Sequence, residues 1–437
     1  MVTINRNQRE RNVISTLTNE LARHVELDRR LVETAQSIRI LTTLAWPEST
    51  YEEFKYGWRR GNPRVPTVQY DTTSDLQRLA ELQSIMNACD RSHPIGNYVY
   101  QTAQSYYLAA RMLESVGTPS FTELSIELYG KPADGIANSE LTHLHAAEYF
   151  TDTTSDFVAA ADIPEDEFSL TAEQVAAALR EQLVPFFDRH PVRIIVDPAM
   201  ASKAAAGAQR IRLRSATLFT PMDVAQLVHH EGYVHMLTAL NGREQPHLSS
   251  LGLAAPRTTW TQEGLATFSE LVSASVDLNR MRRIALRTRA VQMGLDGADF
   301  LEIFRFFLEA GQDEYESFQS AARIFRGGDP RGRIVFTKDV VYLQGLLRTH
   351  TFLRKAVQSN KFYYAEHLFA GRLTLGDVIA LEPFFESGLI APPYYEPPWL
   401  KKRSCLAAYL CYSVFANQID LAAIRLEHFQ NLESGAG

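Results

Sequence analysis

The sequence contains little cysteine and no long apolar run. Its three cysteines, Cys89, Cys405 and Cys411, are an odd number and form no Cys-x-x-Cys pair, which argues against a disulfide framework and for a reducing compartment. No segment has the length and apolar character of a membrane span, and the first dozen residues are charged where a secretory signal would be apolar. We therefore expect a cytoplasmic protein that makes no contact with membranes.

An excess of positive charge is also lacking. The chain has 44 Lys and Arg against 51 Asp and Glu, a formal net charge of -7, whereas a general nucleic-acid binder usually carries a basic excess on one face. We therefore expect no nucleic-acid partner. What the sequence does have is size, because 437 residues that are 45% hydrophobic can bury a substantial core.

Apolar residues follow a helical period through most of the chain. This period runs from about residue 13 to 46, resumes over 76–89 and 98–116, and returns in the C-terminal half, with a last helix expected over about 404–432. Residues 192–197 are instead a β-branched run, and residues 209–214 alternate between polar and apolar, as strands do. The pattern predicts a mainly helical α+β fold with a small sheet built on these two strands.

One predicted helix carries a pair of histidines. It begins at Thr220, an N-cap residue followed by proline, and is expected to stop at Asn241–Gly242. A His-Glu-x-x-x-His string runs from His230 to His235, one residue longer than the His-Glu-x-x-His signature of zinc peptidases. Because the spacing i, i+5 separates two side chains by about 140° on an ideal helix, we predict a π-bulge that brings the two imidazoles together.

A second helix supplies a third candidate ligand. Residues 259–262 fit a capping box, which places Glu263 in the first turns of the following helix. A catalytic zinc takes three protein ligands and keeps a fourth position open for water, so we predict His230, His235 and Glu263 as ligands of Zn²⁺. Glu231, next to the first histidine, is the predicted base that activates the attacking water for amide hydrolysis.

Other residues are candidates for supporting roles. Glu270 shares a helix face with Glu263 and is placed to orient a ligand histidine. Tyr342 and Lys338 are candidate donors to a tetrahedral oxyanion, with ordinary helix packing as the alternative. A substrate carboxylate calls for arginine, and an ordinary solvated strand face is the alternative for those on the strand. The arginine candidates are Arg210, Arg212 and Arg214 on one face of the strand, and Arg243, Arg257 and Arg326 elsewhere.

The string Gln-Glu-Gly-Leu-Ala at residues 262–266 resembles the motif of the QEGLA-motif proteins. That family includes flavohaemoglobin-expression-modulating proteins and microtubule-associated tyrosine carboxypeptidases. Further matching segments lie at 128–132, 240–246, 325–328 and 337–345, so the resemblance spans about residues 120 to 400. It implies that His230, His235 and Glu263 hold zinc, that Glu231 is catalytic, and that the activity is removal of a C-terminal tyrosine.

We accordingly expect a gluzincin-like metallopeptidase whose small sheet precedes the zinc-binding helix. Its expected parts are an N-terminal helical region (1–135), a catalytic region (136–400) and a C-terminal helical extension (401–437). The expected reaction is hydrolysis of the C-terminal peptide bond of a peptide or protein. The alternatives are an endo- or aminopeptidase that matures a peptide, and a non-catalytic regulatory protein with a structural metal, which would need no Glu231 beside an open position.

Overall fold

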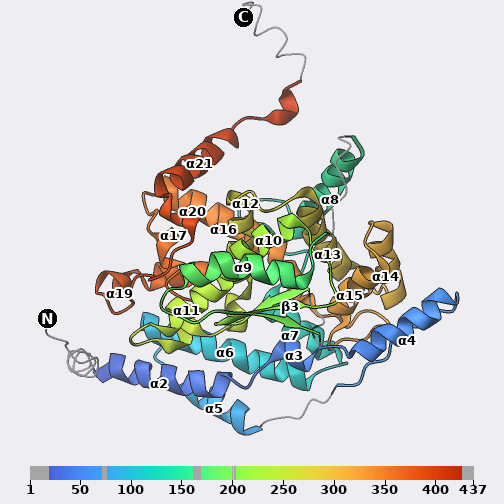
Figure 1. The fold of residues 1–437 in the computed structure, drawn as a ribbon. Coiled ribbons are helices and arrows are strands. Elements are labelled where there is room, and N and C mark those ends of the chain that lie inside the picture. The colour runs from blue at the N-terminus through green and yellow to red at the C-terminus, as the bar shows by residue number, and fades with distance from the viewer. Residues whose placement is uncertain (1–18, 71–75, 161–168, 199, 201–202, 426–437) are drawn as a thin grey trace, which may run out of the picture.

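The computed structural model describes residues 19–70, 76–160, 169–198, 200 and 203–425. It is mainly helical with one small three-stranded sheet near its centre (Figure 1). The prediction of a mainly helical α+β class is therefore confirmed.

The N-terminal part is a layer of helices. These are α2 (Asn19–Ala35), α3 (Ile40–Thr43), α4 (Glu48–Arg59), α5 (Leu76–Ala88), α6 (Pro94–Glu114) and α7 (Pro119–Tyr129). The helical period predicted over residues 13–46 is broken after Ala35, and its first residues lie outside the described part of the chain. Ile38 lies in the break between α2 and α3, where it packs against both large apolar clusters of the protein.

The sheet follows α8 (His143–Ala160) and α9 (Ala172–Phe186). Its strands are β1 (Arg193–Asp197), β2 (Ala204–Ala206) and β3 (Arg210–Arg214), in the order β1-β3-β2. β1 pairs parallel with β3, and β2 pairs antiparallel with β3 so that Ala204 lies opposite Leu213. The two predicted strands are confirmed. β2 escaped prediction because it consists of alanine, a residue depleted in strands.

A long broken helix follows the sheet and lies against it. It consists of α10 (Pro221–Leu227), a π-helical segment η1 (Val228–Met236) and α11 (Leu237–Arg243). The π segment contacts α9, β2 and β3. The small sheet therefore braces the stretch of helix that carries the predicted histidines.

The remaining chain is helical. Its elements are η2 (Ser249–Gly252), η3 (Pro256–Thr258), α12 (Thr259–Val272), α13 (Leu278–Asp296), α14 (Phe300–Glu309), α15 (Glu314–Phe325), η4 (Thr337–Val340), α16 (Val341–Gln358), α17 (Tyr364–His367), α18 (Leu375–Ala380), α19 (Glu382–Glu386), α20 (Pro398–Lys401), α21 (Arg403–Ala416) and η5 (Leu421–Ala423). α12 packs closely on α16, because Gly264 and Gly345 meet where the helices cross. A Cβ at Gly264 would lie 2.3 Å from the carbonyl oxygen of Gly345.

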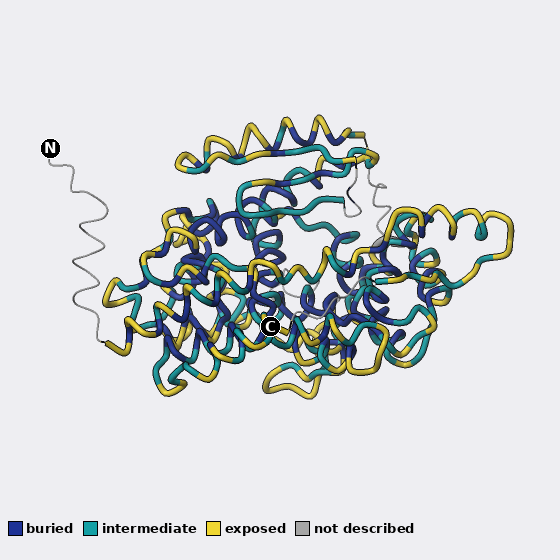
Figure 2. The backbone as a smooth tube through the Cα atoms, turned by 90° about the horizontal axis from the view of Figure 1, so that it is seen from below, coloured by how far each residue is buried: buried dark blue, intermediate teal, exposed yellow. Residues whose placement is uncertain are grey.

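Two large apolar clusters fill the interior, where Figure 2 shows the buried backbone. One joins α9, the sheet and the broken helix to α12 and the C-terminal segments. The other is rich in aromatic rings from α14 and α15, packed against Trp46 and Phe54. Trp260 of α12 packs against both clusters, which fixes this helix between them.

The C-terminal helix is shorter than its apolar pattern predicted. α21 ends at Ala416 and is followed by the short turn η5, whereas we expected helix to about residue 432. Residues from 426 onward lie outside the described part. Among the described helices, none combines the length and apolar character needed to cross a bilayer.

Candidate metal centre

The broken helix begins as its sequence predicts. The Thr220 hydroxyl accepts a hydrogen bond from the Asp223 N–H at 3.1 Å, and the Asp223 carboxylate accepts one from the Thr220 N–H at 2.7 Å. This capping box satisfies two N–H groups at the helix start. The helix continues through Gly242 to Arg243, beyond the predicted stop. Gly242 is needed for close packing, since a Cβ there would lie 2.1 Å from the Leu251 carbonyl oxygen.

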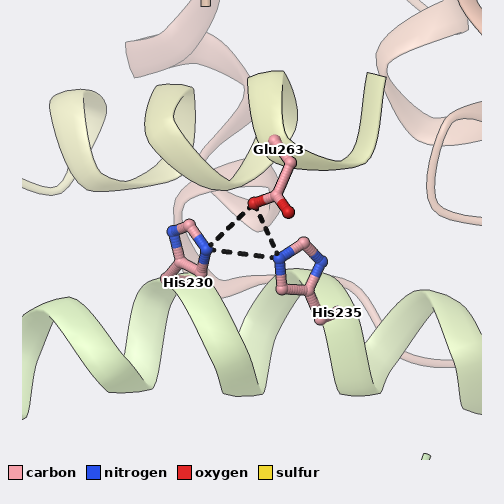
Figure 3. Close-up of side chains that lie close together, drawn as sticks. All are labelled: His230, His235 and Glu263. Carbon is pink, nitrogen blue, oxygen red and sulfur yellow. Dashed lines mark hydrogen bonds and ion pairs between the residues drawn. The ribbon is translucent and has the colours of Figure 1, made fainter. Parts of the chain in front are cut away.

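The predicted π-bulge is confirmed, and it extends over the nine residues of η1. The wider turn of a π-helix absorbs the extra residue between the histidines, so both imidazoles project from the same side of the helix (Figure 3). Gly232, in the middle of η1, lies against α9. A Cβ there would be 2.5 Å from Leu183 Cδ2, so the glycine gives α9 room to pack.

His230, His235 and Glu263 converge between the broken helix and α12 (Figure 3). The two Nε2 atoms are 3.2 Å apart, and Glu263 Oε2 lies 3.5 Å from that of His230 and 3.4 Å from that of His235. Ligands at about 2.05 Å from a tetrahedral zinc are separated by about 3.3 Å. The three atoms therefore form a triangle of the size that a zinc ion requires.

Glu263 reaches this cluster from the second turn of α12. The predicted capping box at residues 259–262 does not form, because the helix begins one residue earlier with Thr258 as N-cap and no side-chain cap. Lys338 Nζ donates to Glu263 Oε1 at 3.3 Å, while the buried Oε2 has no hydrogen bond of good geometry. Burial raises the pKa of the Glu263 carboxyl, but Lys338 and the two histidines outweigh burial and hold this pKa well below its usual range. A carboxylate with one oxygen directed at two imidazoles fits a cation between them.

Glu270 supports the first histidine, as its spacing predicted. His230 Nδ1 donates to Glu270 Oε1 at 2.6 Å, which directs Nε2 toward the cluster. Arg280 of α13 donates to both oxygens of Glu270 at 3.0 Å. Burial lowers the pKa of His230, but the bonds with Glu263 and Glu270 outweigh burial and raise this pKa to about 10. The surrounding carboxylates thus favour positive charge at this point.

Glu231 lies beside the cluster and is held by the sheet. Its Oε2 accepts a hydrogen bond of 2.9 Å from the Ala206 N–H of β2. This contact could not be predicted from the sequence, since nothing in three consecutive alanines indicates an edge strand. His229, next to the ligand pair, packs edge-on against Tyr233 with ring centroids 5.4 Å apart.

Two clefts lie on either side of the cluster of His230, His235 and Glu263. One, of about 230 Å³, is reached by His230 and Glu231 and contains six arginines. We call it the arginine cleft. Its arginines are Arg214, Arg280, Arg283, Arg287, Arg323 and Arg326. The other, of about 350 Å³, is reached by His235 and Glu263, and we call it the tyrosine cleft after Tyr106 and Tyr129 in its wall.

The candidate donor Tyr342 lines the arginine cleft, and its ring centroid lies 5.3 Å from Lys338 Nζ. Lys338 itself lines the tyrosine cleft and is engaged with Glu263. The structure therefore places both residues at the site, but in different clefts. Arg372, which the sequence analysis did not single out, also lines the tyrosine cleft and donates to the His235 carbonyl at 3.1 Å.

The predicted arginines are more scattered. Arg212 forms an ion pair of 3.4 Å with Asp197, and Arg257 is held in a two-point ion pair by Asp377 at 2.6 and 2.9 Å. Arg210 and Arg243 are exposed and line neither cleft. Two other predicted arginines, Arg214 and Arg326, do line the arginine cleft. Three of the six arginines there come from α13. Arg280 and Arg287 are seven residues apart on α13, a spacing that places them on one face of the helix. This spacing could have identified them in the sequence as a pair of arginines on one surface.

A comparison with family models places this geometry in context. The family model described as "Microtubule-associated tyrosine carboxypeptidase" matches residues 52–418, which is most of the chain. The match extends beyond the segments that carried the resemblance, on both sides, and includes all of α21. No curated protein matches the chain in sequence.

Proposed function

The chain belongs to the microtubule-associated tyrosine carboxypeptidase family, and we propose that it is a zinc-dependent carboxypeptidase that hydrolyses the C-terminal peptide bond of a peptide or protein. The observation that carries the proposal is the triangle of His230 Nε2, His235 Nε2 and Glu263 Oε2, with edges of 3.2 to 3.5 Å. The family description supports tyrosine as the residue released.

His230, His235 and Glu263 would hold the zinc ion. Two imidazoles and one carboxylate are a ligand set of catalytic zinc sites, which leave one position open. When bound there, zinc acidifies water and polarises a carbonyl group. Glu270 orients His230 through Nδ1, and Lys338 orients Glu263 through Oε1. Two of the three proposed ligands are therefore held in place by hydrogen bonds that the structure already contains.

Glu231 would move the proton. It accepts the proton of the attacking water and delivers it to the departing amine, the two roles of one carboxylate in amide hydrolysis. The Ala206 N–H holds Glu231 Oε2, which leaves the other carboxylate oxygen for water. Tyr342, in the wall of the arginine cleft, is the proposed donor to the oxyanion, because its neutral phenol hydroxyl can donate a hydrogen bond.

The test uses zinc-loaded protein and peptides that differ only in their last residue, with products read by mass spectrometry. We expect loss of one C-terminal residue, fastest for tyrosine, and no cleavage by Glu231→Gln. Exposed Glu386 in α19 provides the matched control, and Glu386→Gln should cleave like the parent protein. Internal or N-terminal cuts would replace the proposal with another peptidase activity, and bound zinc without Glu231-dependent cleavage would indicate a structural metal.

A further inference from the structure

The arginine cleft holds more guanidinium groups than its carboxylates neutralise. Arg323 forms a two-point ion pair with Asp339 at 2.5 and 2.6 Å, and Arg280 is bound to Glu270. Arg287 and Arg326 line the same cleft. Within the described part of the chain, neither forms a hydrogen bond or an ion pair, and the Nε of each is buried without a partner.

Such an arrangement is costly unless an anion completes it, because a buried cation needs a counter-charge and hydrogen-bond acceptors. Burial and the charge of nearby Arg323 lower the pKa of Arg287 and of Arg326 to about 10. Both guanidinium groups nevertheless stay charged near neutral pH. The planar fork of arginine matches a carboxylate with two parallel hydrogen bonds.

The sheet gives the direction in which a peptide would lie. β2 is an edge strand, and the bonds from Arg214 N–H to the Lys203 carbonyl and from Gly207 N–H to the Arg210 carbonyl join it to β3. Peptide groups alternate between the two sides of a strand, so Ala204 and Ala206 turn theirs outward. The bond from Ala206 N–H to Glu231 confirms that this outer edge faces the proposed catalytic site.

β2 runs from one cleft to the other. Ala204 lines the arginine cleft and Ala206 lines the tyrosine cleft. A peptide added to this edge in the antiparallel sense runs in the opposite direction, from the tyrosine cleft to the arginine cleft. Its C-terminus then lies among the guanidinium groups. In the parallel sense a positively charged N-terminus would lie there, which the cleft's charge opposes.

We propose that the arginine cleft binds the terminal carboxylate of a peptide that pairs antiparallel with β2, and that Arg287 and Arg326 are its principal donors. This inference rests on the proposed function and adds the residues that restrict it to chain ends. A carboxylate held on one side of His230 and Glu231 leaves the last peptide bond at the proposed metal. A chain that continues past this point has no charge to offer the two arginines.

The experiment measures binding, separately from cleavage. Zinc-loaded Glu231→Gln protein is titrated with two fluorescent peptides of one sequence, one ending in a free carboxylate and the other in a carboxamide. We expect the acid to bind about 10- to 100-fold more tightly, the range for hydrogen bonds to charged groups. Adding Arg287→Met or Arg326→Met should weaken binding of the acid and leave that of the amide unchanged, so that the ratio falls toward one.

Arg289→Met is the matched control, since Arg289 lies on α13 two residues from Arg287 but does not line the cleft. It should keep the full acid-to-amide ratio. Methionine retains most of the arginine stem, and zinc content with circular dichroism verifies folding. If Arg287→Met does not fold, Arg287→Lys replaces it and should retain part of the preference, because lysine keeps the charge but loses the fork.

Equal binding of acid and amide by the Glu231→Gln protein would overturn the inference, as would an unchanged ratio in both arginine variants. The proposed function can fail independently. If the Glu231→Gln protein prefers the acid but the parent protein cleaves no peptide, the carboxylate site is supported and the carboxypeptidase activity is refuted. If the parent protein cleaves the acid and the amide at equal rates and the Glu231→Gln protein cleaves neither, the peptidase activity is supported and the carboxylate site is refuted.

Discussion

Among single residues, Glu270 affects the proposed metal centre most directly without being one of its ligands. It accepts bonds from His230 Nδ1 and from Arg280, and it is fully buried. Glu270→Gln keeps the size of the side chain but removes the charge. We expect zinc affinity to fall about 10- to 100-fold, as when other outer partners of metal ligands are replaced. Competition with a chromophoric chelator measures this affinity.

The control for this substitution is Glu316→Gln. Glu316 also lines the arginine cleft but forms no bond to a proposed zinc ligand among the described contacts, so zinc affinity should not change. Equal affinity in Glu270→Gln and the parent protein would show that the His230–Glu270 bond does not tune the site.

A second buried carboxyl, Asp28 in α2, predicts a pH effect on stability. Burial raises its pKa to about 6, although hydrogen bonds from Ser250 and Ser249 oppose this. Between the unfolded pKa of 3.8 and about 6, the folded state binds more protons than the unfolded state. The contribution of protonated Asp28 is therefore complete below about pH 4 and is lost as the pH rises through 6, a change of about 3 kcal/mol.

Urea unfolding of the chelator-treated parent and of Asp28→Asn, at pH 4 and at pH 7, tests this effect. The free energy of unfolding of the parent should fall relative to that of the variant by about 3 kcal/mol between these pH values. Other groups titrate alike in both proteins and cancel in the difference. A difference that is constant with pH would mean that Asp28 keeps an ordinary pKa in the folded state.

At the scale of elements, the crossing of α12 and α16 positions Glu263. Gly264 follows this ligand directly, and its Cα side faces Gly345 with no room for a methyl group. Gly264→Ala should force the helices apart and lower the free energy of unfolding by about 1–3 kcal/mol, the usual cost of overpacking. It should also weaken zinc binding, because Glu263 would move away from the histidines.

Gly376→Ala, in helix α18, is the control for this substitution. There the nearest atom to an added Cβ is Thr374 Oγ1 at 3.8 Å, so stability should be unchanged or slightly higher. Chemical denaturation of both variants gives the comparison. A Gly264→Ala protein as stable as Gly376→Ala would show that the crossing tolerates a wider separation.

Elements also show where sequence reasoning was sufficient. In the helix with His230 and His235, the signals for its start, its apolar faces and the unusual histidine spacing all lie within one short stretch of sequence. Even its π segment could therefore be predicted. β2 carried no comparable pattern, because its place depends on pairing with β3 and on the Glu231 carboxylate. α21 was predicted too long because its apolar residues continue beyond Ala416 while the helix does not.

For the whole molecule, the proposed ligands come from two separate helices, so binding a metal should stabilise the fold. A ligand at a thousandfold excess over its dissociation constant contributes about 4 kcal/mol. We expect the melting temperature to rise by several degrees on zinc addition and to fall with a chelator. Glu231→Gln should show the same shift and Glu263→Gln should lose it, because only the latter removes a proposed ligand. Scanning calorimetry of the parent and of both variants, each with zinc and with a chelator, measures these shifts.

The distribution of arginines shows what the whole molecule adds to its sequence. Arg257 and Arg212 were reasonable candidates by position, yet folding gives them Asp377 and Asp197 as partners. Arg287 and Arg326 lie in different helical regions and meet only in the folded chain. Tertiary contacts decide which arginines are neutralised by a carboxylate. The sequence of a single segment therefore cannot show which arginines remain available to bind a substrate.

The three alanines of β2 have a consequence for which proteins the enzyme would accept. A strand with only methyl side chains offers an incoming peptide its backbone and little else, and backbone pairing is the same for nearly every sequence. Selection would then fall on the last residue and its free end, while the residues before it could vary widely. One such enzyme would trim many unrelated proteins that share an ending, and its choice among them would depend on which tails are accessible.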